Sequence, residues 1–160
     1  MKIPFNSEQI LIGGEWRNAE NNETLDVINP STGELLCKIG RGSPRDVDDA
    51  VAAAQAALDG EWGALSAMER YMEFYGGAAD KVMGHTIPYM DGYTVYTMRE
   101  PHGVTGHIVP WNYPMQIAGR CIGGALAMGN TCVLKPAEDA CLTALMFARI
   151  AEEAGLPKGV

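Results

Sequence analysis

The chain has 160 residues, of which 47% are hydrophobic and 20% charged, as in an ordinary globular domain. Twelve basic and twenty acidic residues give a formal net charge of −8, which argues against nucleic acid as a partner because phosphate backbones attract basic patches. No run of about eighteen apolar residues occurs and the N-terminus has no apolar leader, so we expect a cytoplasmic protein without a membrane partner.

Two turn signals open the chain. The pair Gly13-Gly14 lies between two short apolar stretches, and a glycine pair is the preferred turn of a tight β-hairpin. A second turn cluster at residues 29–33 separates two segments in which apolar and polar residues alternate. Together these features predict an N-terminal β-meander at an antiparallel edge.

Helical signals follow. Ser43 and Asp46 form a capping-box pattern before a run with helical spacing that ends at Gly60. The next residues predict a second helix with Ser66 as its cap, which continues directly into a helix over residues 71–82.

Further along, residues 90–98 interleave large apolar residues with threonines, which predicts a solvent-touching strand. Residues 140–154 have apolar and charged faces at helical spacing and predict a helix that Gly155 and Pro157 stop.

The most informative stretch lies between these two segments. Residues 104–109 and 131–134 are short β-branched runs, and residues 115–128 are long, apolar and rich in small side chains. Two short strands joined by one helix predict a right-handed βαβ crossover with parallel strands. The expected fold class is therefore α/β, with a parallel Rossmann-like sheet and flanking helices, and ligands should bind at the carboxyl ends of the strands.

The motifs IVPWNYP and VLKPAE, separated by the Gly/Ala-rich helix, resemble the NAD(P)-dependent aldehyde dehydrogenase superfamily, as do GGEW and NPSTGE near the N-terminus. The resemblance covers only the N-terminal portion of the family, so residues 1–160 are interpreted as a partial NAD-binding region, incomplete relative to the family. A long helical region of the family is missing at Arg70-Tyr71. The resemblance also implies that residues 86–102 belong to an oligomerisation arm, and that the full-length form is a homodimer or homotetramer.

Asn112 is the sharpest candidate for a catalytic role. It follows the first parallel strand, between prolines that stiffen the loop, and its amide can donate to a developing oxyanion. The resemblance implies this role in aldehyde oxidation, where a thiolate attacks the carbonyl. An ordinary turn asparagine beside a proline is the alternative interpretation.

Lys135 and Glu138 follow the second parallel strand and can bracket a ribose, the ammonium binding one hydroxyl and the carboxylate accepting from another. The carboxylate would repel a 2′-phosphate, so NAD is favoured over NADP as the cofactor. A solvated surface pair is the alternative. The resemblance adds a floor and wall beneath the nicotinamide half, formed by Ile108, Val109, Pro110 and Trp111.

Arg120 lies on the apolar helix, where a charge is unexpected. It shares a helix face with Tyr113 and Ile117, which together would line a substrate pocket. Relatives that oxidise semialdehydes with a distal carboxylate can carry an arginine here, so an anionic aldehyde is one interpretation. A charge that reaches the surface or pairs structurally is the other.

Several features argue against other chemistry. The glycines of the helix do not form a GxGxxG dinucleotide-binding fingerprint. The resemblance implies that none is needed, because the aldehyde dehydrogenase superfamily binds its dinucleotide without it. The three histidines do not cluster, so no metal is expected. The four cysteines show no CxxC pair and are expected to be free thiols, and Cys121 is rejected as a nucleophile because it lies on an apolar helix without an adjacent base.

The family's nucleophilic cysteine and general-base glutamate have no match in this chain. We therefore expect part of an aldehyde dehydrogenase that oxidises a small-molecule aldehyde to a carboxylic acid with NAD, and we expect the 160 residues alone to be inactive. The alternative is a truncated paralogue that acts as an oligomerisation or binding module through the strand at residues 93–98.

Overall fold

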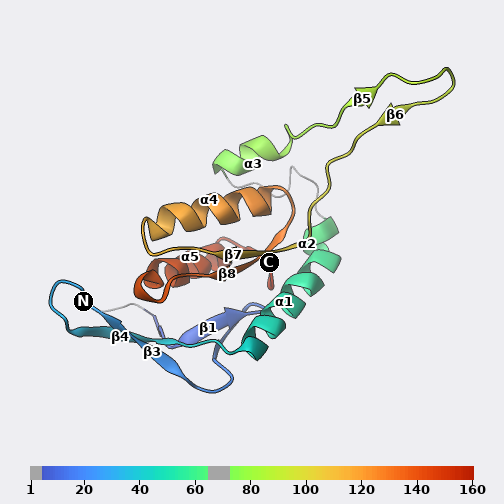
Figure 1. Ribbon diagram of the computed structural model, residues 1–160. Helices are drawn as coiled ribbons and strands as arrows, with labels where there is room; N and C mark the ends of the chain where they lie inside the picture. The colour runs from blue at the N-terminus through green and yellow to red at the C-terminus, as the bar shows by residue number, and fades with distance from the viewer. Residues whose placement is uncertain (1–4, 65–72) are drawn as a thin grey trace.

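The computed structural model describes residues 5–64 and 73–160 of the chain (Figure 1). The described strands are β1 (Gln9–Ile12), β2 (Glu15–Asn18), β3 (Thr24–Ile28), β4 (Leu35–Gly40), β5 (Thr86–Ile87), β6 (Val95–Tyr96), β7 (Val104–Ile108) and β8 (Thr131–Lys135). The described helices are α1 (Pro44–Asp59), α2 (Glu61–Ala64), α3 (Glu73–Ala79), α4 (Pro114–Ala127) and α5 (Leu142–Glu153), with a 3₁₀ turn, η1 (Glu138–Ala140), before α5.

The N-terminal strands form two antiparallel hairpins, β1–β2 and β3–β4. Gly13 and Gly14 have φ of 60° and 74°, so the predicted glycine turn is confirmed. The hairpins are separate two-stranded sheets, which differs from the single continuous meander expected. The connection after β2 explains this separation. There the backbone N–H of Glu20 donates to the carboxylate of Asp46 at the start of α1 and not to a neighbouring strand.

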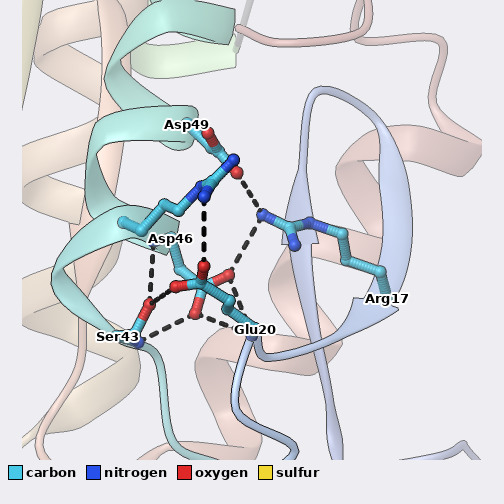
Figure 2. A network of polar contacts seen from close by, with 6 residues as sticks. Arg17, Glu20, Ser43, Asp46 and Asp49 are labelled. Carbon is cyan, nitrogen blue, oxygen red and sulfur yellow. Dashed lines mark hydrogen bonds and ion pairs between the residues drawn. The ribbon is translucent and has the colours of Figure 1, made fainter.

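The predicted capping box of α1 is confirmed. The Oγ atom of Ser43 accepts from the backbone N–H of Asp46 at 3.2 Å, and the carboxylate of Asp46 accepts from the N–H of Ser43 at 2.8 Å. The same carboxylate, 3% exposed, also receives the Glu20 N–H and the guanidinium of Arg17 at 3.0 Å (Figure 2). One buried carboxylate thus joins the β1–β2 hairpin to helix α1.

The middle of the chain is built from short helices. The indole of Trp62 in α2 is buried and donates to the backbone carbonyl of Asn130 at 3.0 Å. Ser66 and the start of the helix predicted over residues 71–82 lie outside the described residues. The described part, α3, ends at Ala79 instead of Val82 because the Nζ atom of Lys81 donates to the carbonyl of Gly77 and satisfies the end of the helix.

Residues 84–100 form an extended arm that projects from the body of the molecule (Figure 1). Its ladder is short, with Thr86 opposite Tyr96 and Ile87 opposite Val95. The prediction of one strand over residues 90–98 is correct only for Val95–Tyr96, because residues 90–94 form the turn between β5 and β6 and residues 97–98 lie beyond the ladder. Gly92 has φ of 86° there, a conformation that favours glycine.

The parallel pair β7–β8 and its crossover helix α4 are confirmed, with Val104 opposite Thr131 and Ile108 opposite Lys135. The helix predicted over 140–154 is present as α5, preceded by η1. Helices α4 and α5 cover one side of β8 with a cluster of apolar side chains: Trp62, Ile122, Leu126, Cys132, Leu134 and Phe147. The α/β fold class is therefore as predicted.

The side chains of Asn130 and Arg149 each connect two elements of the fold. The side chain of Asn130 accepts from the N–H of Gly103 at 3.0 Å and donates to the carbonyl of Ala125 at 3.0 Å, which links the end of α4 to the start of β7. The guanidinium of Arg149 stacks 4.2 Å from the centre of the Trp16 ring and fastens α5 to the β1–β2 hairpin. Within residues 5–64 and 73–160, no helix is long and apolar enough to cross a bilayer.

Candidate active site at the strand ends

The carboxyl ends of β7 and β8 lie side by side. Ile108 and Lys135 are the last register pair, and the N–H of Val109 donates to the carbonyl of Lys135 at 3.1 Å, which extends the pairing by one residue. The loops that carry Asn112 and Glu138 begin directly after this pair. The structure therefore brings the two predicted polar groups to one edge of the sheet, where open α/β sheets bind ligands.

The loop after β7 leaves the amide of Asn112 exposed and unused. The next residue, Tyr113, has φ of 53° and is the N-cap of α4, but no side chain caps this helix. In the described part of the chain the amide of Asn112 has no hydrogen-bond partner. A turn asparagine normally bonds to its own loop, so this arrangement favours an amide that is free to donate to a ligand.

Lys135 and Glu138 bind each other. The Nζ and Oε1 atoms are 2.6 Å apart, and both side chains are more than half exposed. The hydrogen bond from Lys135 lowers the pKa of Glu138, and its own backbone N–H adds to this effect. An exposed pair of this kind contributes little to stability, so both side chains can re-orient towards a ligand at low cost.

The four residues predicted beneath the nicotinamide ring divide into two groups. Ile108 and Trp111 are 85% and 67% exposed, and Pro110 is exposed as well. Val109 is 4% exposed and packs into the core, because successive side chains of a strand point to opposite faces. Ile108, Pro110 and Trp111 can thus form a surface, whereas Val109 can contribute only backbone atoms.

The predicted pocket residues lie along the first turns of α4. Tyr113 and Arg120 are exposed and Ile117 is half-buried. No ion pair or hydrogen bond holds Arg120 among residues 5–64 and 73–160, so its guanidinium is available to an anion. The carbonyl of Tyr113 accepts from the N–H of Ile117 at 3.0 Å, which fixes the start of the helix.

A polar cluster on the strands was not predicted. The hydroxyl of Thr105 donates to the carbonyl of Thr131 at 2.8 Å and lies 2.9 Å from Nε2 of His107 and 3.7 Å from the sulfur of Cys132. The one hydroxyl proton is shared between the Thr131 carbonyl and the Cys132 sulfur, and the direction of the hydrogen bond with His107 depends on the tautomer of its ring. The i, i+2 spacing of Thr105 and His107 on one strand face was the signal in the sequence.

The other polar features do not form a second site. The described residues contain no group of three or more histidine, cysteine or acidic side chains that could hold a metal ion. A groove elsewhere on the described residues is lined by Ala53, Ala57, Trp62 and Lys158. It lies near the amino ends of the strands, since Trp62 binds Asn130 just before β8, and it contains none of the candidate residues.

The parallel pair, its crossover helix and the polar loops at the strand ends define a partial Rossmann-like α/β domain. The chain belongs to the aldehyde dehydrogenase family, whose model matches residues 16–72 and 70–160.

Individual relatives agree with this assignment. The chain is 39% identical to hydroxyisobutyraldehyde dehydrogenase of Mycolicibacterium austroafricanum over 194 residues, covering 94% of this chain and 38% of the relative. A crystal structure of a candidate aldehyde dehydrogenase from Burkholderia cenocepacia is 48% identical with a TM-score of 0.90, covering 93% of this chain and 40% of that one. The NAD⁺ complex of Bacillus cereus aldehyde dehydrogenase has a TM-score of 0.93 at 30% identity, covering 96% and 40% of the two chains.

The chain therefore spans about two fifths of the length of these relatives. The two segments matched by the family model meet at residues 70–72. The alignment with the mycobacterial relative is 194 residues long, which exceeds the 160 residues of this chain, so the relative contains residues that this chain lacks. This agrees with the internal gap predicted at Arg70-Tyr71.

Proposed function

We propose that this chain provides the oxyanion donor and the adenosine-ribose contacts for NAD-dependent oxidation of an aldehyde to a carboxylic acid. One observation carries the proposal: the free amide of Asn112 and the Lys135–Glu138 pair lie at the ends of two adjacent parallel strands. A common edge allows one extended ligand to contact both loops.

The role of Asn112 follows from the charge that develops during the reaction. Attack of a thiolate on an aldehyde leaves a negative oxygen, and a preplaced N–H donor stabilises it more than it stabilises the neutral carbonyl. Pro110 and Pro114 restrict the backbone of the loop on either side of Asn112, which favours an amide that is placed before the substrate arrives. The thiolate and the base that activates water are proposed to lie outside this chain, so the 160 residues alone should not form NADH.

Lys135 and Glu138 are suited to the hydroxyl groups of a ribose. An ammonium donates to one hydroxyl, while a carboxylate accepts from another, and the exposed side chains of this pair can re-orient towards both hydroxyls. When bound, NAD accepts the hydride of the oxidation. Ile108, Pro110 and Trp111 present an exposed apolar surface on the neighbouring loop that fits the nicotinamide half.

The carboxylate of Glu138 favours NAD over NADP, because it would repel a 2′-phosphate. Solved relatives include both an NAD⁺ complex and an Escherichia coli enzyme described as NADP dependent, so the choice depends on residues of this chain. The exposed Arg120, which has no acidic partner in the described residues, favours an aldehyde with a distal carboxylate, and Tyr113 and Ile117 would line the same pocket.

Titration of the purified chain with NAD and with NADP tests the cofactor assignment. We expect tighter binding of NAD, and we expect Glu138→Gln to lose this preference because the repulsive charge is removed. Glu153→Gln, an exposed acid at the end of α5, is the matched control and should bind as the parent chain does. Equal binding of both dinucleotides by the parent chain would refute the role given to Glu138.

A second function is favoured by the arm. Residues 86–102 project from the body, and the large side chains Tyr89, Met90, Tyr93, Tyr96 and Met98 are more than half exposed. We propose that this segment joins copies of the chain, because a group of exposed large apolar side chains is typical of protein–protein interfaces. Sedimentation should show a dimer or larger assembly that Tyr96→Glu dissociates. A monomeric parent chain would exclude this function and leave the cofactor assignment untouched.

A further inference from the structure

Two cysteines that are far apart in the sequence face one apolar cluster. Val27, Ile39 and Cys141 are buried together, and Leu25, Cys37 and Leu142 pack against them. The cluster joins the β3–β4 hairpin to the start of α5, where Cys141 is the N-cap residue. Both thiols are free in this structure.

The register of the hairpin directs Cys37 towards this cluster. Cys37 lies opposite Val27 in the β3–β4 ladder, and directly opposed residues project from the same face of a sheet. Ile39 is two residues further along β4 and also belongs to the cluster, as the alternation of side chains requires. Cys37 is half-buried, whereas Cys141 is 4% exposed, so one thiol lies at the rim of the cluster and the other inside it.

We propose that Cys37 and Cys141 form a reversible disulfide under oxidising conditions, which fastens the β3–β4 hairpin to the start of α5. The oxidant is a peroxide. It converts the Cys37 thiolate to a sulfenic acid with loss of hydroxide, and the sulfur of Cys141 then displaces a second hydroxide from the Cys37 sulfur as the Cys141 proton is lost. Two thiols and one peroxide thus give one disulfide and two waters.

The two thiols have different tasks in this sequence. Cys37 reacts first because it is the more accessible sulfur. Burial raises the pKa of Cys141 to about 11, so this thiol stays protonated and closes the bond only after Cys37 has been oxidised. Closure should therefore become faster as the pH rises towards that value.

The remaining cysteines provide the control. Cys132 packs against the Ile122 cluster on the other side of the fold, and Cys121 lies on α4. Neither belongs to the cluster of Cys141, so of the six pairs that four cysteines allow for one bond, only Cys37–Cys141 is expected.

The bond has a consequence for the candidate site. The turn η1 contains Glu138 and ends directly before Cys141, so the disulfide would restrain the segment that carries this carboxylate. An effect of oxidation on NAD affinity rests on the proposed function, whereas formation of the bond does not. Separate measurement of the two distinguishes their failures.

Treatment of the dilute chain with hydrogen peroxide, followed by thiol counting and peptide mapping, tests the proposal. We expect two of the four thiols to be lost, a Cys37–Cys141 peptide, and a rise in thermal midpoint of several degrees that dithiothreitol reverses. Cys37→Ser, at the half-buried position, should fold and lack all three changes, whereas Cys121→Ser should keep them. Four free thiols after oxidation, or a bond that includes Cys121 or Cys132, would overturn the proposal.

Discussion

The guanidinium of Arg17 lies 3.0 Å from the carboxylate of Asp46, and that carboxylate is almost completely buried. The contact joins the end of the β1–β2 hairpin to the first turn of α1. The same carboxylate also accepts from the N–H groups of Ser43 and Glu20, so both of its oxygens have partners. This carboxylate therefore links the hairpin to the helix through both side-chain and backbone contacts.

Replacement of Asp46 should be costly. Asp46→Ala removes the acceptor of the buried Ser43 N–H and of the partly buried Glu20 N–H, and it leaves Arg17 with Asp49 alone, so we expect a loss of about 3 kcal/mol in the free energy of unfolding. Asp49→Ala removes a half-exposed carboxylate that also contacts Arg17 and should cost less than about 1 kcal/mol. Urea denaturation measures both, and equal costs would contradict the central position of Asp46.

The same carboxylate makes stability depend on pH. Burial alone would raise the pKa of Asp46, but the hydrogen bonds from Ser43 and Glu20 and the charge of Arg17 outweigh it and lower the pKa below 3.8. A lowered pKa means that the stabilisation is complete above the unfolded value and is lost as the pH falls through the folded value. The stability difference between the parent chain and Asp46→Asn should therefore shrink below about pH 4, and a constant difference would contradict this assignment.

Two glycines of α4 should respond oppositely to alanine. A Cβ atom at Gly123 would lie 2.7 Å from the ring of Tyr75, whereas one at Gly119 would meet nothing within 4 Å. Gly123→Ala should therefore destabilise by about 1–3 kcal/mol, and Gly119→Ala should stabilise by up to about 1 kcal/mol because alanine favours the helix. Thermal midpoints compare the two variants, and stabilisation by both would contradict the close approach of Tyr75 in α3 to Gly123 in α4.

Asn130 provides a test of the link between the end of α4 and the start of β7. Asn130→Ala removes the acceptor of the buried Gly103 N–H and the donor to Ala125, so we expect a loss of about 2–3 kcal/mol. Asn18→Ala, which breaks an exposed side-chain contact with Asn22, should change stability by less than about 0.5 kcal/mol. If Asn130→Ala cost no more than this control, the link between α4 and β7 would be unimportant.

Local patterns in the sequence predicted the parts of the fold that short-range chemistry determines. The glycine turn, the capping box of α1 and the order β7–α4–β8 are confirmed because each depends on neighbouring residues. The ion pair of Arg17 with Asp46 could not be predicted, since it depends on how the hairpin packs against the helix. The turn at residues 90–94 was taken as strand because Tyr93 and Thr94 have strand propensity.

The candidate site was predicted only in part. The strand ends are adjacent as expected, but alternation along the backbone buries Val109, which the motif alone placed beside a cofactor. The left-handed backbone at Tyr113 was not foreseen, because a bulky residue rarely adopts it. The roles of Asn112, Lys135 and Glu138 stay predictions, which titration with NAD can test.

Titration of the isotopically labelled chain with NAD, followed by amide NMR, tests the central claim most directly. We predict that the largest shift changes fall on residues 108–113 and 135–138, including the indole N–H of Trp111, while the amides around Arg17 and Asp46 do not move. Changes confined to the groove beside Trp62 and Lys158, or no changes at all, would contradict a cofactor site at the ends of β7 and β8.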